Sequence, residues 1–418
     1  FKHPLFSEEV IKKEIQIINS EFYLQIDEPY HLIDAIIRQL CTNKTSYYGF
    51  TSGNNITLNP DESWAISKKL KSYHNLVNKP ENIFFLIYSN QTIKELENYA
   101  AKYLNYEMYK FPENETDKTE EEQLLKNLYK FEQFEIFDDN LYGHGIFYNS
   151  HDRKNYVNIF FHVGDMNLKE LQFDAFEYFS YLFKSESLMR LLKQKNYICS
   201  MNNIDAIISI FIKNNCVFNI DLELTENGLN NLKDVLLIIY KYIDIMKKEG
   251  FKKEYFNNFI KFKQNKNNKN FQKEMFSILT TFSDFIENYR FYGVNQIFTY
   301  GTSTYEMYDQ DILKQLLNKI KFEKSFFITN TISKATELKT FLDSPSKRKL
   351  KYYNVDYLIG KIPNDFIKEI KDKNYEIDNN LSMRKVNPYF SEKYGKVIPC
   401  YKQEINNCKE LNEFDYEL

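Results

Sequence analysis

The stretch Ser7–Glu21, SEEVIKKEIQIINSE, decides how the first part of the chain folds. Ser7 followed by two glutamates is typical of a helix N-terminus, where a hydroxyl caps free amides and the helix dipole favours negative charge. Apolar residues then recur at three- and four-residue spacings, a period that predicts a helix with most of one side apolar. These residues are Val10, Ile11, Ile15, Ile17, Ile18 and Phe22.

Two acids lie within this apolar pattern. Glu14 and Glu21 are seven residues apart, which is about two helical turns, so the two side chains project from the same side of the helix. A carboxylate on a buried face is costly unless it is paired or binds a cation. Two interpretations stay open: a metal ligand with a supporting acid, or two glutamates that face solvent or meet a lysine or arginine.

The segment KKEIQIINSE at 12–21, followed by a helix and then by SGNNITL at 52–58, resembles the insulinase (pitrilysin) family of zinc metallopeptidases, the inverzincins, in its insulin-degrading-enzyme-like branch. In this family two histidines of a His-x-x-Glu-His motif on an upstream helix bind zinc, and the glutamate between them is the general base. The resemblance implies that Glu21 is the third zinc ligand. It implies that Glu14 is the acid that supports the site from seven residues earlier.

The chain departs from the family at the histidines. Its six histidines are His3, His31, His74, His144, His151 and His162, and no two of them frame a His-x-x-Glu-His motif. The resemblance places that motif on a helix just upstream of Phe1. We therefore expect this chain to be an internal piece, an N-terminal half that lacks the histidine helix.

Composition bounds the class of protein. A chain of 418 residues is long enough for two or three domains. The net charge of −3 comes from interspersed acids and bases, which gives no basic footprint for nucleic acid. The sequence has no run of eighteen apolar residues, so it predicts no membrane span. Five cysteines without a CxxC pair do not predict a disulfide framework, and they weakly favour a reducing compartment, either cytoplasm or an organelle lumen.

We predict an α+β fold in repeated domains, each with helices on one face of a mostly antiparallel sheet. The predicted division is 1–112 for the later part of a first insulinase-like domain, 113–123 for an acidic linker, 124–345 for a second such domain, and 346–418 for a closing segment and linker toward a second half. Predicted helices are 29–41, 61–79, 93–104 (packed over the strand 82–89), 168–183, 187–197, 226–250 and 252–290, the last interrupted at QNKNNKN. Predicted strands are 82–89, 131–137, 156–163, 204–212, 216–224 and 324–332.

The resemblance continues in the second predicted domain. DLELTENGL at 221–229 and KYYNVDYLIGKIPNDFIKEI at 351–370 resemble family segments. Family members place a glycine-rich segment where this chain has FKSESLMRLL at 183–192. Side chains there would obstruct the close approach of a peptide to the backbone.

Two function classes follow. The first is a zinc-dependent metalloendopeptidase that cleaves peptides in an enclosed chamber, whose partner is a second homologous half or a partner subunit and whose cofactor is Zn²⁺. The second is a non-catalytic insulinase-like homologue or subunit with a structural or substrate-binding role. A nucleotide-binding enzyme is not indicated, because neither a GxxxxGK[ST] nor a GxGxxG motif is present.

Overall fold

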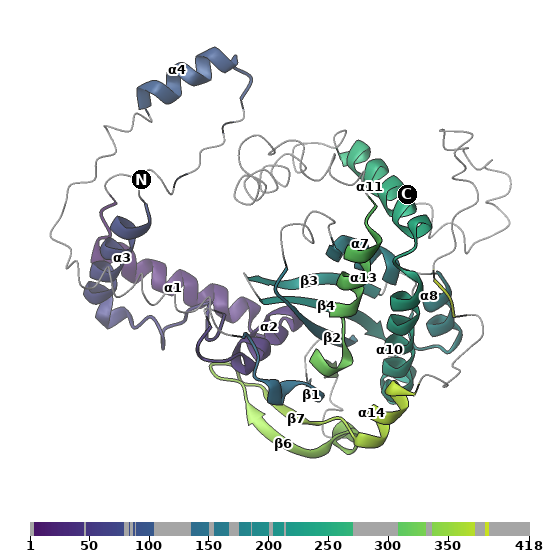
Figure 1. Ribbon diagram of the computed structural model, residues 1–418. Coiled ribbons are helices and arrows are strands. Elements are labelled where there is room, and N and C mark those ends of the chain that lie inside the picture. Colours follow the sequence, from purple (N-terminus) through teal and green to yellow (C-terminus); the bar gives the residue numbers. More distant parts are fainter. Residues whose placement is uncertain are drawn as a thin grey trace, which may run out of the picture. The chain divides into compact units, whose positions relative to one another are not determined.

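The computed structural model describes residues 4–45, 47–78, 83, 87, 89–103, 135–149, 154–166, 175–184, 186–199, 204–212, 215–270, 308–331, 337–372 and 381–383. The chain divides into two compact units (Figure 1). Unit 1 comprises 1–138, 150–152 and 349–355, and unit 2 comprises the rest. The four-part division predicted from the sequence stays a prediction.

Unit 1 is helical in its described part. Its elements are α1 (Glu8–Gln25), α2 (Pro29–Leu40), η1 (Pro60–Glu62), α3 (Ser63–Val77) and α4 (Ile93–Tyr103). The predicted helices 29–41 and 61–79 are confirmed. Helix α4 forms where it was predicted, but it buries none of its residues, and most of the strand expected beneath it, 82–89, lies outside the described residues.

The core of unit 1 includes an aromatic cluster that joins distant parts of the chain. Phe22 of α1 meets the rings of Phe50 and Tyr353 edge-on, each with ring centroids 5.3 Å apart. Tyr353 belongs to the short piece 349–355, which returns to unit 1 some 300 residues later in the sequence. Edge-to-face contacts of this kind add to the hydrophobic stabilisation of a core.

Unit 2 contains a seven-stranded sheet in the order β3-β4-β2-β5-β1-β7-β6. Among the neighbouring pairs with a defined register, only β1 and β5 run parallel. The strands are β1 (His144–Asn149), β2 (Asn155–Gly164), β3 (Ile204–Ile212), β4 (Asn215–Leu224), β5 (Ser325–Thr331), β6 (Asp343–Lys349) and β7 (Asp356–Lys361). The predicted mostly antiparallel sheet is therefore confirmed.

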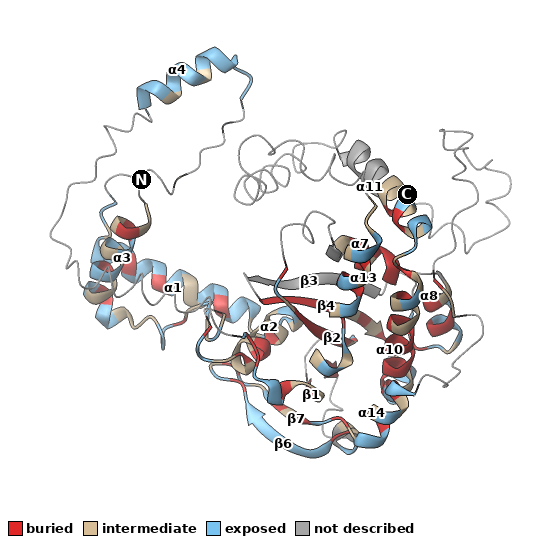
Figure 2. Ribbon diagram, viewed as in Figure 1, coloured by how far each residue is buried: buried red, intermediate tan, exposed pale blue. Residues whose placement is uncertain are grey.

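Helices pack on one face of this sheet, as predicted for the α+β class. They include α7 (Ala175–Phe183), α8 (Glu186–Gln194), α9 (Glu226–Asn230), α10 (Leu232–Glu249), α11 (Lys253–Asn270), α13 (Gln310–Lys319) and α14 (Asn364–Lys371), with short 3₁₀ turns η5 (Asp139–Leu141), η8 (Phe322–Lys324) and η9 (Glu337–Phe341). Alternate residues of β2 and β4 enter the core. Helix α10 is buried along most of its length (Figure 2), which explains why its sequence is apolar nearly all round.

Several sequence predictions need correction. Helix α11 includes the polar run QNKNNKN up to Asn270, where an interruption was predicted, and the rest of the predicted helix, 271–290, lies outside the described residues. The predicted helix 226–250 is divided at Asn231 into α9 and α10. Of the predicted strand 131–137, residues 131–134 lie outside the described part, and 135–137 form only an isolated bridge between Phe137 and Cys41.

Candidate active site

Helix α1 begins where the sequence predicts, but without the predicted cap. Ser7 has the extended conformation of an N-cap residue, yet its hydroxyl makes no capping hydrogen bond. Glu8 and Glu9 lie in the first turn, where the helix dipole favours acids. Lys13 forms an ion pair with Glu9 one turn earlier, at 2.8 Å between Nζ and Oε1.

The buried side of α1 is narrower than predicted. Ile11, Ile15 and Phe22 are the buried residues of the helix. At about 100° per residue, the centre of these positions lies roughly a quarter of a turn away from Glu14 and Glu21. Both glutamates are exposed, so the prediction that they lie on a buried face directed toward a pocket is wrong. The helix instead uses the 11, 15, 22 positions to pack.

The exposed side of α1 combines the two acids with apolar residues. Val10, Ile17 and Leu24 are 60%, 50% and 81% exposed. With Glu14 and Glu21 they follow the spacing i, i+4, i+7, i+11, i+14, which places all five on one stripe of a helix. Single exposed apolar residues are common on proteins, but a continuous stripe is typical of a binding surface.

Within the described part of the chain, the carboxylates of Glu14 and Glu21 make neither an ion pair nor a hydrogen bond. For a non-metal role, the sequence left open that the two glutamates face solvent or that they pair with a lysine or arginine. The structure shows them facing solvent. The described residues contain no group of three or more histidine, cysteine or acidic side chains that could hold a metal ion. Helix α1 carries carboxylate oxygens of the kind that zinc accepts, and it carries none of the imidazoles that the resemblance implies for the site.

A compact turn at 53–58 supports the middle of α1. The buried Asn54 side chain accepts hydrogen bonds from the backbone amides of Ile56 and Thr57, each at 3.0 Å. The amide of Asn55 then donates to Oδ1 of Asn19 on α1, also at 3.0 Å. Gly53 adopts a positive φ of 81°, which glycine tolerates without strain. The segment SGNNITL, one of the segments that resemble the family, therefore forms a compact turn that is hydrogen-bonded to α1.

In unit 2, the segment 183–192, where the resemblance predicts a glycine-rich stretch, lies largely within helix α8 (Glu186–Gln194). Helix α8 begins at Glu186, and Leu188, Met189 and Leu192 are buried in the core. The hydroxyl of Ser187 donates to the carbonyl of Ser382 and accepts from its amide, at 2.5 and 3.1 Å. The Ser187 side chain thus binds the backbone of Ser382, and the backbone from Glu186 onward lies within helix α8.

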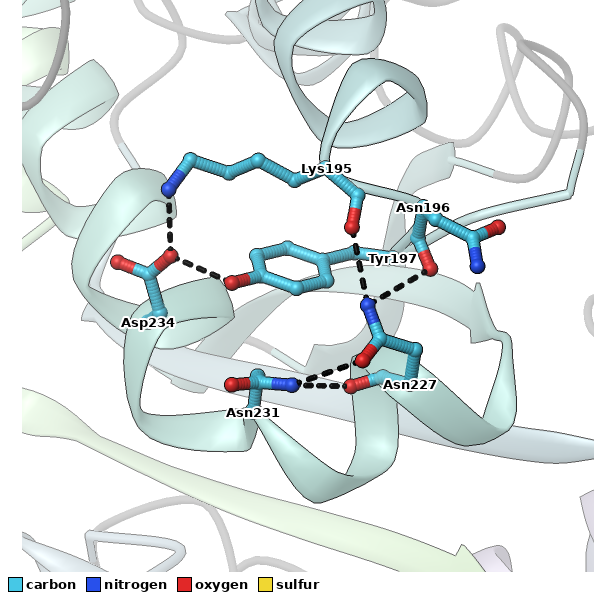
Figure 3. Close-up of polar contacts among 6 residues, drawn as sticks. All are labelled: Lys195, Asn196, Tyr197, Asn227, Asn231 and Asp234. Atoms are coloured by element: carbon cyan, nitrogen blue, oxygen red, sulfur yellow. Dashed lines mark hydrogen bonds and ion pairs between the residues drawn. The ribbon is translucent and has the colours of Figure 1, made fainter.

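The segment DLELTENGL forms the end of β4 and the start of α9, and a polar cluster anchors it (Figure 3). Asp234 of α10 accepts from Lys195 Nζ at 2.9 Å and from the Tyr197 hydroxyl at 2.7 Å. Asn227 donates to the carbonyl of Lys195 at 3.0 Å, and Asn231 donates to the carbonyl of Asn227 at 2.8 Å. These contacts join the turn after α8 to the start of the long helices. The cluster has a structural role.

The comparisons with known proteins follow the same fold. No protein-family model matches the chain. A crystal structure of pitrilysin superposes with a TM-score of 0.70 at 17% identity, covering 93% of this chain and 38% of that chain. This likeness defines the fold as that of an insulinase-type peptidase.

The similarities to curated sequences agree with this fold. The chain is 23% identical over 429 residues to the A-factor-processing enzyme of Saccharomyces cerevisiae, covering 99% of this chain and 37% of the relative. It is 21% identical over 392 residues to the insulin-degrading enzyme of Drosophila melanogaster, covering 93% and 37%. The chain is similar to members of the insulinase (pitrilysin) family over nearly its whole length, and it spans 37% of the length of these two relatives. Among the described residues, no helix is long and apolar enough to cross a membrane.

Proposed function

We propose that this chain is part of a zinc-dependent metalloendopeptidase that cleaves peptides in an enclosed chamber, and that an upstream segment completes its active site. The observation that supports the proposal most directly is the stripe on α1, where Glu14 and Glu21 are exposed and unpaired between exposed apolar residues. A carboxylate that completes a site together with ligands from another segment has to be accessible on this chain.

The residues of α1 would have three separate roles: binding zinc, orienting a ligand, and anchoring the helix. Glu21 would hold the zinc ion through a carboxylate oxygen, and Glu14, two turns earlier on the same stripe, would orient one of the ligands. Bound zinc supplies Lewis acidity and lowers the pKa of a water molecule. Ile11, Ile15 and Phe22 anchor the helix, and the turn at 53–58 fixes it through Asn19. The second half of the chamber would come from a homologous segment or a partner subunit.

A second candidate is a non-catalytic homologue that contributes a structural or substrate-binding wall. It rests on the segment 183–192, where the resemblance implies glycines: the chain has no glycine there, and helix α8 forms from Glu186 with Ser187 bonded to Ser382. The two candidates differ in one measurable property, which is whether the intact protein binds zinc through Glu21.

Metal analysis and a peptide-cleavage assay on the intact protein test the proposal. We expect Glu21→Gln to lower the zinc content and to abolish cleavage that a chelator also abolishes. Glu14→Gln should reduce metal affinity or activity by about 10- to 100-fold, as loss of an acid that supports a metal ligand typically does. The matched control is Glu8→Gln, an exposed acid on the same helix but far around it from the stripe.

Unchanged zinc content and cleavage in Glu21→Gln would show that the ligand assignment is wrong. If the unsubstituted protein holds no zinc and cleaves no peptide in the presence of added zinc, the non-catalytic role is the correct one.

A further inference from the structure

Strand β6 (Asp343–Lys349, sequence DSPSKRK) is the outermost strand at one end of the described sheet. Every one of its residues is exposed (Figure 2). An edge strand presents backbone N–H and C=O groups that have no partner within the sheet, so another chain can pair with them. The composition of β6 indicates which kind of chain that is.

The chain directly after β6 shows which backbone groups point away from the sheet. The Leu350 amide donates to the Val355 carbonyl at 2.9 Å, toward the returning chain. Its two neighbours face the other way: the Lys349 carbonyl accepts from Gln39 Nε2 at 3.1 Å, and the Lys351 amide donates to Gln39 Oε1 at 3.0 Å. The Gln39 side chain thus pairs with the outer edge as the peptide group of a neighbouring strand would.

The same alternation continues back along β6. Because backbone groups in an antiparallel pair point alternately toward and away from the partner, the amide and carbonyl of Lys347 point outward, as does the carbonyl of Pro345. Proline has no N–H to offer. The outer edge therefore presents one acceptor at 345, a donor and an acceptor at 347, and a donor at 349, which is the pattern that an added strand requires.

Strand β6 also has a surplus of positive charge, in a chain whose net charge is −3. Three cations, Lys347, Arg348 and Lys349, stand against one acid, Asp343. Lys347 is paired with Asp356 of β7, at 2.7 Å between Nζ and Oδ2. Within the described part of the chain, the side chains of Arg348 and Lys349 form neither an ion pair nor a hydrogen bond.

The positive charge extends onto the neighbouring strands. Lys361 of β7 lies directly opposite His144 of β1. Burial lowers the pKa of His144, hydrogen bonds to the carbonyls of Tyr142 and Leu141 oppose that change, and the charges of Lys361 and Arg348 lower the pKa further. The charged side chains that act on His144 are thus cations of β7 and β6.

We propose that β6 binds an acidic peptide in extended conformation as an additional strand of the sheet. The backbone at 345–349 supplies the hydrogen bonds, and Arg348 and Lys349 select glutamate or aspartate side chains, one on each face of the strand. Opposite charges on neighbouring strands attract, whereas like charges repel. The same cations therefore disfavour pairing between two copies of β6. This site is independent of the metal site proposed on α1.

Three dye-labelled peptides test the proposal by fluorescence anisotropy on the full chain, at low ionic strength and without added metal. The first alternates glutamate and threonine and is long enough to span β6. The second has glutamine in place of every glutamate. The third is the acidic peptide with every backbone amide N-methylated, which keeps the charge and removes the hydrogen-bond donors. We expect the first peptide to bind at least tenfold more tightly than either of the others.

Substitutions in the chain separate charge from backbone pairing. The double variant Arg348→Gln and Lys349→Gln should weaken binding of the acidic peptide at least fivefold, because two cross-strand charge pairs are lost. The matched control is Lys248→Gln with Lys253→Gln, which removes two exposed cations of α10 and α11 and should leave binding unchanged.

The backbone is tested at position 347. Lys347→Pro removes the outward N–H in the middle of the edge, and a proline is compatible with an edge strand where that N–H faces solvent. Lys347→Gln removes the same ammonium and keeps the N–H. We expect the proline variant to bind the acidic peptide at least tenfold more weakly than the glutamine variant.

Equal binding of the acidic and glutamine peptides would overturn the proposal, as would the absence of saturable binding for the acidic peptide. Equal binding of the methylated and unmethylated acidic peptides would show attraction by charge alone, and the added strand would then be wrong. Circular dichroism establishes that each variant is folded, and the double glutamine variant keeps the test decisive if the proline variant is not. Because the titration involves neither zinc nor cleavage, its outcome and that of the metal-site test are separate.

Discussion

At the scale of single residues, Asp234 shows how one partly buried carboxylate organises a junction. It accepts from Lys195 and from Tyr197 (Figure 3), two residues that end the turn after α8. Gly228 completes the junction, because a Cβ there would lie 2.3 Å from the carbonyl oxygen of Tyr197. The backbone at 197 and the start of α9 thus touch directly, and only glycine permits that approach.

We predict that Tyr197→Phe costs about 1 kcal/mol of the free energy of unfolding at neutral pH, because the ring is kept and one hydrogen bond is lost. Burial, and then the hydrogen bond to Asp234, raises the pKa of Tyr197 to about 12. An unfolded tyrosine ionises near pH 10, so between pH 10 and 12 the unfolded state loses the proton first and stability falls as pH rises. Denaturant unfolding across this range should show a shallower decline in Tyr197→Phe.

The control for this prediction is Tyr23→Phe, since the Tyr23 side chain is 59% exposed. It should leave both the neutral stability and the alkaline decline unchanged. An alkaline decline of the same slope in Tyr197→Phe and in the unsubstituted protein would contradict the assignment of the titrating group.

Single residues also show how much of the candidate site could be predicted from the sequence. The seven-residue spacing of Glu14 and Glu21 correctly placed both acids on one side of a helix. It could not tell which side packs, because Val10, Ile17 and Leu24 make the exposed stripe as apolar as the buried one. The metal role of Glu21 stays a prediction from resemblance and spacing.

At the scale of elements, two helix starts with similar sequences behave differently. Ser7 and Thr225 are both hydroxyl residues followed by glutamate, and both are extended. Thr225 accepts a hydrogen bond from the Gly228 amide at 2.9 Å and donates to the Asn196 carbonyl at 2.6 Å, whereas the Ser7 hydroxyl makes no capping bond. Tertiary contacts therefore decide which of the two hydroxyl residues caps its helix.

We predict that Thr225→Ala lowers the free energy of unfolding of unit 2 by about 1–2 kcal/mol, the usual cost of a lost N-cap with a second hydrogen bond. Ser7→Ala is the matched substitution and should change the stability of unit 1 by less than about 0.5 kcal/mol. Thermal unfolding followed by circular dichroism checks both. A similar loss in the two variants would mean that the hydroxyl at 7 caps α1 in solution.

The strands of unit 2 also differ in whether the sequence predicts them. Strands β2, β3, β4 and β5 were predicted because each is a run of β-branched and aromatic residues. Strands β1, β6 and β7 were not predicted. The edge strand β6, DSPSKRK, is exposed at every position, so it has no apolar period to detect, and its proline and basic residues are typical of protected sheet edges. In β1 and β7, Gly145 and Gly360 interrupt the apolar pattern where neighbouring side chains pack closely.

At the scale of the whole molecule, the two units have separate cores. The large cluster of buried apolar residues lies wholly in unit 2, whereas unit 1 depends on a smaller set that includes Ile15, Phe22 and Leu32 of its first helices and Tyr353 from 349–355. Separate cores allow separate unfolding transitions, and a two-state description then fails for the chain as a whole. The protein contains one tryptophan, Trp64, and it lies in α3 of unit 1.

We predict that Phe22→Ala destabilises unit 1 by about 3–5 kcal/mol, because the ring is 3% exposed and loses its contacts with Phe50 and Tyr353. Trp64 fluorescence should report a lower midpoint, while the main calorimetric transition stays in place. Ile238→Ala, in the fully buried middle of α10, is the matched control and should lower only the main transition. If fluorescence and calorimetry shift together in both variants, the two units unfold as one body and the prediction of separate transitions is wrong.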